Sequence, residues 1–197
     1  MSRNTTLSVL LSAAMLLGAS GTTQAAEEGE VAALVAESRG MVQTFFGKLK
    51  GELEAAMKNG GPAAAIKTCN EKAIPLTDEL GAQSGWTLGR TSLKLRNPDN
   101  APDAWERSVL ESFETRKAAG EDVTKLEQHV IVEEGGQRLW RYMKAIPTAA
   151  QPCLLCHSAA LLPAVASQIK ELYPEDQAVG YAAGDIRGAF TFQKVIK

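Results

Sequence analysis

One pentapeptide constrains this chain more than any other feature: Cys153-Leu154-Leu155-Cys156-His157. Two cysteines three positions apart in a helical turn project on the same side of it. The histidine that follows then lies next to any group that the two thiols bind. This spacing is the attachment sequence of c-type haem, in which Cys153 and Cys156 add across the haem vinyl groups and His157 offers a nitrogen to the iron. We therefore predict one covalently bound haem c, with His157 as the proximal iron ligand.

Three other interpretations of the motif are weaker. A thioredoxin-like redox pair opens a helix after a strand, and the flanking sequence of such a pair is missing. A structural zinc site would combine the motif with Cys69 or His129, but the second close ligand pair that is usual in zinc sites is absent. A plain disulfide between Cys153 and Cys156 is the third alternative.

The first 25 residues have the pattern of a secretory signal peptide. Arg3 gives a short basic start, an apolar run extends from Leu7 to Leu17, and Thr23-Gln24-Ala25 supplies small residues at the cleavage positions. The apolar run is too short to span a membrane, and no later segment is long and apolar enough to do so. We expect a periplasmic protein in which residues 26–197 form a single domain. That compartment is oxidising, so the cysteines of an exported chain need a function.

Composition excludes several classes of protein. The chain is 45% hydrophobic and 22% charged, as is ordinary for a globular protein. Its formal net charge is -2 and it has no lysine or arginine cluster. We therefore expect no nucleic-acid partner.

Hydrophobic periodicity predicts an α+β domain that begins with a long helix. Apolar residues at steps of three and four predict a helix over about 27–58, ended by Asn59-Gly60-Gly61. A second helix starts at Pro62 and carries Cys69 on its inward face, and Pro75 is expected to kink or break it. The remaining predicted elements are an extended segment over 86–95, a helix that carries Trp105 and ends near Gly120, two strands over 126–134 and 137–146 joined at Gly135-Gly136, a helix over 161–172 and a final strand from about 186.

The residue types alone do not decide which side chain is the second axial ligand of the iron. His129 lies in an alternating strand pattern, and Met57 and Met143 lie on apolar faces that are more typical of a core. Cys69 faces inward and has no thiol left to pair with. It is an iron ligand, an inert buried thiol or half of an intermolecular disulfide.

Several stretches together resemble a family of small exported bacterial haem proteins with a PAS-like fold. They are Ala65-Ile66-Lys67-Thr68-Cys69, Arg90-Thr91-Ser92-Leu93-Lys94-Leu95-Arg96-Asn97-Pro98, the haem motif, Tyr173-Pro174-Glu175-Asp176, Gly180-Tyr181 and Gly184-Asp185-Ile186-Arg187-Gly188. The resemblance spans nearly the whole mature chain. It implies a five-stranded antiparallel sheet packed with helices that hold the haem. It also implies a helical cysteine opposite the motif histidine, which makes Cys69 the candidate distal ligand.

The Arg90–Pro102 stretch has two interpretations. It is a strand, a turn and a helix cap, or Arg90 or Arg96 also pairs with the haem propionates, since arginine binds carboxylates in a fork. Arg187 is a weaker candidate of the same kind.

These observations favour a mono-haem c-type cytochrome, not an enzyme, that relays electrons to an unidentified redox partner protein. An iron with protein ligands on both faces suits electron transfer, because little rearrangement is needed. The alternative is a haem-based redox or gas sensor that acts through a separate partner. A haem enzyme such as a peroxidase is the least favoured of the three functions, because no distal His-Arg arrangement is visible in the sequence.

Overall fold

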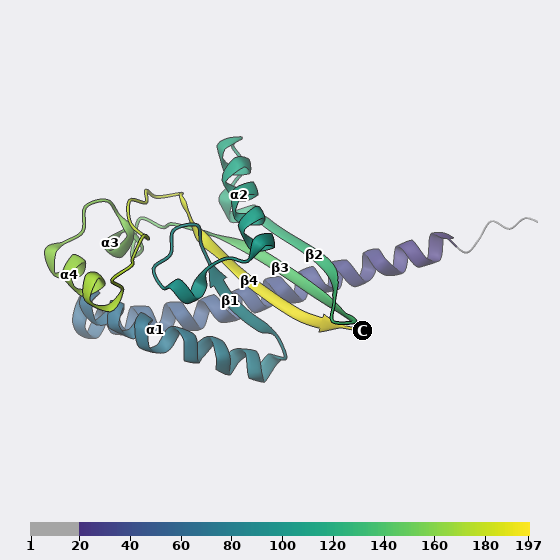
Figure 1. Cartoon of the computed structure of the whole chain (residues 1–197), viewed down its shortest axis with the longest axis horizontal. Helices are drawn as coiled ribbons and strands as arrows, with labels where there is room; N and C mark the ends of the chain where they lie inside the picture. The colour runs from purple at the N-terminus through teal and green to yellow at the C-terminus, as the bar shows by residue number, and fades with distance from the viewer. Residues whose placement is uncertain (1–19) are drawn as a thin grey trace, which may run out of the picture. The chain divides into compact units, whose positions relative to one another are not determined.

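A computed structural model describes residues 20–197 (Figure 1). The predicted signal peptide, residues 1–25, lies outside the described residues except for 20–25, which belong to helix α1 (Ser20–Ser84), so it stays a prediction. The chain divides into two compact units at Leu34 and Val35. The described part of the first unit, 20–34, is helical, and the following paragraphs concern residues 35–197. Within the described residues, no helix combines the length and the apolar character needed to cross a membrane.

Helix α1 is broken where the sequence predicts it. Gly60 and Gly61 have non-helical backbone angles, and Gly61 has a φ of 68°, a conformation that favours glycine. The chain turns back at this break (Figure 1), so α1 has a first arm that ends at residue 59 and a second arm over 62–84. Lys72 of the second arm lies 2.7 Å from the Glu52 carboxylate of the first arm. The predicted pair of helices is confirmed.

Pro75 does not end the second arm, which continues to Ser84. Ala73 and Leu80, on either side of the proline, are buried in the core. Proline removes only one backbone donor from the helix, and this packing holds the helix together around it. The sequence predicts a kink or a break at Pro75, and the continuous helix shows that the break does not occur.

Four antiparallel strands form one sheet in the order β1-β4-β3-β2. They are β1 (Thr87–Thr91), β2 (Glu127–Glu134), β3 (Gln137–Pro147) and β4 (Ile186–Ile196). The predicted hairpin is confirmed, since β2 and β3 pair across Gly135-Gly136. Five strands were expected, and residues 20–197 contain four. The segments 92–102 and 148–185 form turns and short helices instead, because their prolines lack the N–H that a sheet ladder needs.

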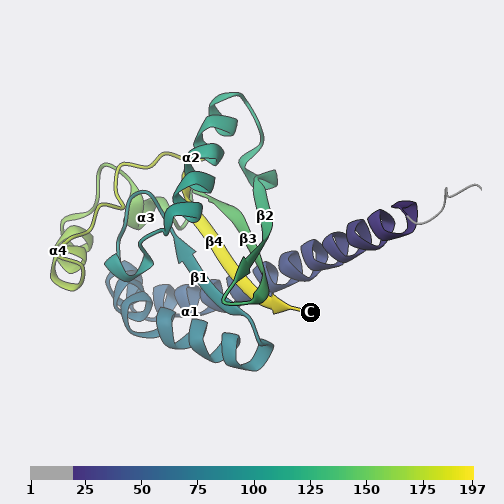
Figure 2. The same ribbon diagram turned by 45° about the vertical axis from the view of Figure 1, so that its right-hand side comes forward.

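Helices cover both faces of the sheet, so the predicted α+β class is confirmed (Figure 2). Residues 35–59 of α1 lie on one face, where the Phe45 ring is 5.7 Å from the Phe190 ring. Helix α2 (Ala104–Ala118) packs on the other face through a cluster that includes Phe113, Met143 and Ala189. Ala189 and Phe190 are neighbours in β4, so they point to opposite faces.

Two short helices complete the second unit, α3 (Leu154–His157) and α4 (Pro163–Leu172). Figures 1 and 2 both place them beside the turn of α1. Val165 and Ile169 of α4 pack in one apolar cluster with Ile66 of the second arm, and Cys156 lies against that cluster. This packing brings the pentapeptide next to the arm that carries Cys69.

Candidate functional site

The pentapeptide forms a single helical turn. Cys153 is the N-cap of α3, and the Cys156 N–H donates to the Cys153 carbonyl at 3.1 Å. Cys153, Cys156 and Cys69 are all free thiols. The structure therefore keeps both attachment thiols available and contains no disulfide between them.

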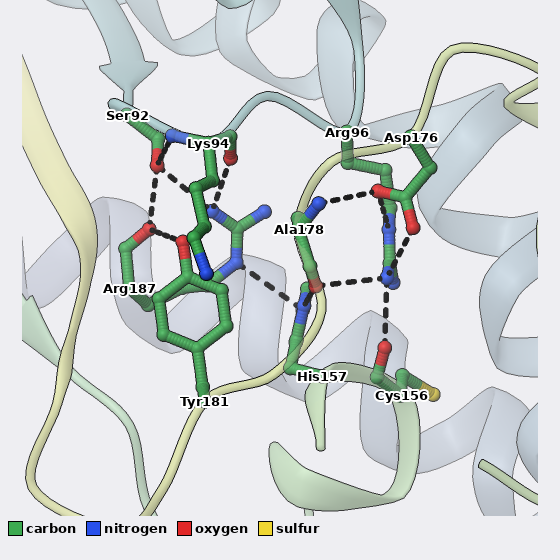
Figure 3. A network of polar contacts seen from close by, with 9 residues as sticks. All are labelled: Ser92, Lys94, Arg96, Cys156, His157, Asp176, Ala178, Tyr181 and Arg187. Carbon is green, nitrogen blue, oxygen red and sulfur yellow. Dashed lines mark hydrogen bonds and ion pairs between the residues drawn. The ribbon is translucent and has the colours of Figure 1, made fainter. Parts of the chain in front are cut away.

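His157 is held in one tautomer. Its Nδ1 lies 2.7 Å from the Ala178 carbonyl oxygen, which only accepts hydrogen bonds, so Nδ1 carries the proton. Its Nε2 therefore has a lone pair, to which Arg187 Nε donates at 3.4 Å (Figure 3). Burial, with the charges of Arg187 and Arg96, lowers the pKa of His157 to about 3. The ring is neutral at pH 7 and has the form that ligates a metal.

The third thiol lies close to this turn. Burial raises the pKa of Cys69, and the positive charges of Arg90 and Arg96 oppose that rise. Burial also raises the pKa of Cys156, against the charge of Arg96, and the proximity of Cys69 adds to that rise. The fold thus brings Cys69 and Cys156 close enough for their charges to interact, although they lie 87 positions apart in the sequence.

Arg96 is bound to protein groups through its Nε and Nη2 nitrogens. Its Nε donates to Asp176 Oδ1 at 3.0 Å, and its Nη2 donates to the Cys156 carbonyl at 2.7 Å. The guanidinium is therefore paired with a carboxylate and tied to the pentapeptide turn.

Arg90 and Arg187 differ from Arg96 because neither has a carboxylate partner among the described residues. Arg187 Nη1 donates to Ser92 Oγ at 3.2 Å, and its guanidinium lies 5.5 Å from the centre of the Tyr181 ring. Arg90 makes no side-chain hydrogen bond within 20–197, and burial lowers its pKa. Burial lowers the pKa of Arg187 as well. Half-buried cations without a counter-charge are costly, so this pair is typical of a site for an anionic group.

The other ligand candidates lie elsewhere. His129 in β2 stacks on Trp140 with the ring centres 4.8 Å apart, and Met143 is buried in the cluster under α2. Among residues 20–197, no group of three or more histidine, cysteine or acidic side chains is arranged to hold a metal ion. The described residues thus give no support to a zinc site.

Two residues of the site had no role in the sequence analysis. Asp176 binds Arg96, and Ala178 offers its carbonyl to His157. Asp176 stands in a stretch that carries the family resemblance, which is the one signal that pointed to it. Ala178 acts through its backbone, so its side chain carries no signal.

The fold and the site together define an α+β protein with a candidate haem-attachment turn. The chain belongs to the Tll0287-like family, whose model matches residues 19–193. Among solved structures it is similar to the crystal structure of the cyanobacterial heme protein Tll0287, with 25% identity and a TM-score of 0.56 over 82% of this chain and 96% of that one. A search of curated proteins found no match. The resemblance to a haem-protein family is confirmed, while the PAS-like description and covalent attachment stay predictions.

Proposed function

We propose that this protein is an exported, periplasmic c-type cytochrome that carries one covalent haem and transfers electrons without catalysing a reaction of its own. The observation that carries the proposal is the turn in which two free thiols precede a neutral imidazole whose Nε2 lone pair faces only the long 3.4 Å contact from Arg187 Nε. Membership of the Tll0287-like family and similarity to a heme protein support it. Bound haem would supply a one-electron iron couple.

The residues present fit such a group. The Cys153 and Cys156 thiols would form the two thioether links, and His157 Nε2 would hold the iron. Arg90 and Arg187 supply two cations that have no carboxylate partner within the described part of the chain, and these match the charge of the two haem propionates. Arg96 was an equal candidate for this contact in the sequence, but its pairing with Asp176 favours Arg187 instead.

Cys69 is the proposed distal ligand. It is close enough to Cys156 for their charges to interact, and the charges of Arg90 and Arg96 oppose the rise in its pKa that burial causes. Thiolate is an established haem-iron ligand in proteins. Ligands from the chain on both faces would leave the iron no open position, which suits electron transfer.

Carbon monoxide binding tests this function against a sensor or an enzyme. The reduced wild-type protein is titrated with carbon monoxide while its visible spectrum and its reduction potential are recorded. We expect a reversible one-electron couple and a spectrum that carbon monoxide leaves unchanged. Rapid formation of a carbon monoxide complex by the wild-type protein would contradict a six-coordinate electron carrier and favour a gas sensor with a displaceable ligand.

A further inference from the structure

Arg96 joins the two chain segments that hold the His157 ring. Its Nη2 donates to the carbonyl of Cys156 at 2.7 Å and to the carbonyl of Ala178 at 3.3 Å (Figure 3). The first carbonyl belongs to the turn that carries His157. The second accepts the hydrogen bond of His157 Nδ1 at 2.7 Å. One guanidinium nitrogen therefore binds both the residue that precedes His157 and the carbonyl that accepts the His157 hydrogen bond.

Asp176 fixes the position of that guanidinium. Its carboxylate accepts from Arg96 Nε at 3.0 Å and from Arg96 Nη2 at 3.2 Å, which is a forked pair. The same carboxylate accepts the Ala178 N–H at 2.9 Å. The side chains of Arg96 and Asp176 are only 12% and 6% exposed. A forked, charge-assisted pair shielded from water holds its geometry far better than a surface ion pair.

We propose that the Arg96–Asp176 pair is a positioning device for His157, which fixes the ring orientation and the strength of its Nδ1 hydrogen bond. The proposal rests on the proposed function, in which Nε2 of the same ring binds iron. A hydrogen bond at one ring nitrogen makes the other a stronger donor to a metal. Arg96 therefore acts on the iron through Ala178 and Cys156, and no contact between Arg96 and a propionate is needed.

The ring proton of His157 gives a direct readout. The chain has only two histidines, so ¹⁵N-histidine labelling yields two sets of ring signals, and His129, stacked on Trp140, is an internal control. The variant Arg96→Lys keeps the positive charge and loses the fork. We expect exchange of the His157 Nδ1 proton with solvent to become about tenfold faster, which is the size of effect that loss of a charge-assisted contact produces. The His129 signals should not move.

The reduction potential separates this role from a propionate contact. A looser Nδ1 hydrogen bond makes the imidazole a weaker donor, which favours ferrous iron, so Arg96→Lys should raise the potential. A propionate contact predicts an unchanged ring proton and a potential that is unchanged or lower. The matched control is Arg116→Lys, in which Arg116 of α2 loses its forked pair with the exposed Glu121 that follows the helix, and it should change neither quantity.

A second variant covers the case in which Arg96→Lys does not fold. Asp176→Asn keeps the shape of the side chain and removes the charge that orients Arg96, and it should also speed exchange of the His157 ring proton. Unchanged exchange in either folded variant, or a wild-type ring proton found on Nε2, would overturn the proposal. Absence of haem from the wild-type protein would contradict the proposed function alone, because the ring proton can also be followed in a haem-free chain.

Discussion

Cys69 is the residue whose surroundings say most about the redox chemistry of the site. It is a free thiol close enough to Cys156 for their charges to interact, and the charges of Arg90 and Arg96 oppose the rise in its pKa that burial causes. An anionic thiolate stabilises ferric over ferrous iron more than a neutral ligand does. The identity of this one side chain should therefore set much of the reduction potential.

Replacement of Cys69 by methionine should raise the reduction potential. About 59 mV corresponds to a tenfold change in a one-electron equilibrium, or roughly 1.4 kcal/mol. Loss of a ferric preference of a few kcal/mol gives a rise on the order of 100 to 200 mV, since Met/His ligation favours the reduced state. Potentiometric titration of Cys69→Met measures the shift.

Replacement of Cys69 by alanine should open the distal position, so that the reduced iron binds carbon monoxide. A Cys69→Ala protein with the wild-type spectrum and potential would show that Cys69 is an inert thiol.

Arg90 should have opposite effects with and without haem. In a haem-free Cys153→Ala/Cys156→Ala chain, Arg90→Met removes a half-buried cation that has no carboxylate partner among residues 20–197, and it should raise the free energy of unfolding by about 1 to 3 kcal/mol. In the haem-loaded protein the same change leaves a propionate without its counter-charge and should lower the reduction potential. Denaturant titration and potentiometry measure the two effects. Destabilisation of the haem-free chain by Arg90→Met would show that Arg90 has a stabilising partner there.

At the scale of single elements, the β1–β4 contact depends on one glycine. A Cβ on Gly188 would collide with the backbone carbonyl oxygen of Thr91 in β1. Gly188→Ala should therefore lower the free energy of unfolding by more than 3 kcal/mol, a loss typical of severe steric clashes. The matched control is Gly51→Ala in α1, where a Cβ meets no atom within 4 Å and the stability should rise by up to about 1 kcal/mol. Thermal unfolding of both variants measures the two changes in stability, which should have opposite signs. Equal changes in the two variants would contradict the predicted clash at Gly188.

Helix α2 begins at a capping box whose strength depends on pH. The Asp103 carboxylate accepts from the Glu106 N–H at 2.8 Å and lies 2.6 Å from Arg141. Burial raises the pKa of Asp103, but the Glu106 hydrogen bond and Arg141 outweigh it, so the net pKa is lowered. A lowered folded-state pKa gives stability that is present above the unfolded value and lost as pH falls through the folded one. This cap should weaken in acid.

Asp103→Ala should cost about 1 kcal/mol of stability at pH 7, and Asp103→Asn, which keeps a capping oxygen, should cost less. The difference between wild type and Asp103→Ala should shrink as pH falls below the ordinary range for aspartate. Denaturant unfolding at neutral and acidic pH measures it. A difference that stays constant into strong acid would show that the carboxylate charge adds nothing to the cap.

Local chemistry explains which elements the sequence predicts correctly. The helix break at Gly60-Gly61 and the hairpin at Gly135-Gly136 follow from residues inside the turns themselves. The break expected at Pro75 does not occur because the helix packs there against distant parts of the chain. The fifth strand, which the family resemblance implied, is absent from residues 20–197 because the prolines of the remaining segments lack the N–H that a sheet ladder needs. The burial of Ala73 and Leu80 is decided by tertiary contacts that a local pattern does not contain.

The residues of the candidate site also fall into those that local sequence predicts and those that only the fold reveals. Cys153, Cys156 and His157 are contiguous, so their spacing alone predicts the attachment turn. The partner of Arg96 is Asp176, 80 residues away along the chain, so nothing in the residues around Arg96 distinguishes an internal pair from a propionate contact. The difference between Arg96 and Arg187 appears only once the fold places their partners.

At the scale of the whole molecule, segments far apart in the sequence hold one turn, the pentapeptide 153–157, in place. Ile66 of α1 and the residues of α4 pack against Cys156, while Arg96 and Ala178 hold the adjacent carbonyl and the His157 ring. Every part of this arrangement has a function if a covalent group is attached at Cys153 and Cys156.

The most direct test is the intact mass of the purified protein under denaturing, acidified conditions, which strip haem that is not covalently bound. We expect a wild-type chain that starts after Ala25 and carries the mass of one haem. The Cys153→Ala/Cys156→Ala variant should have the same start and no added mass. A wild-type polypeptide without added mass, obtained from cells that attach haem to other cytochromes, would contradict the central claim.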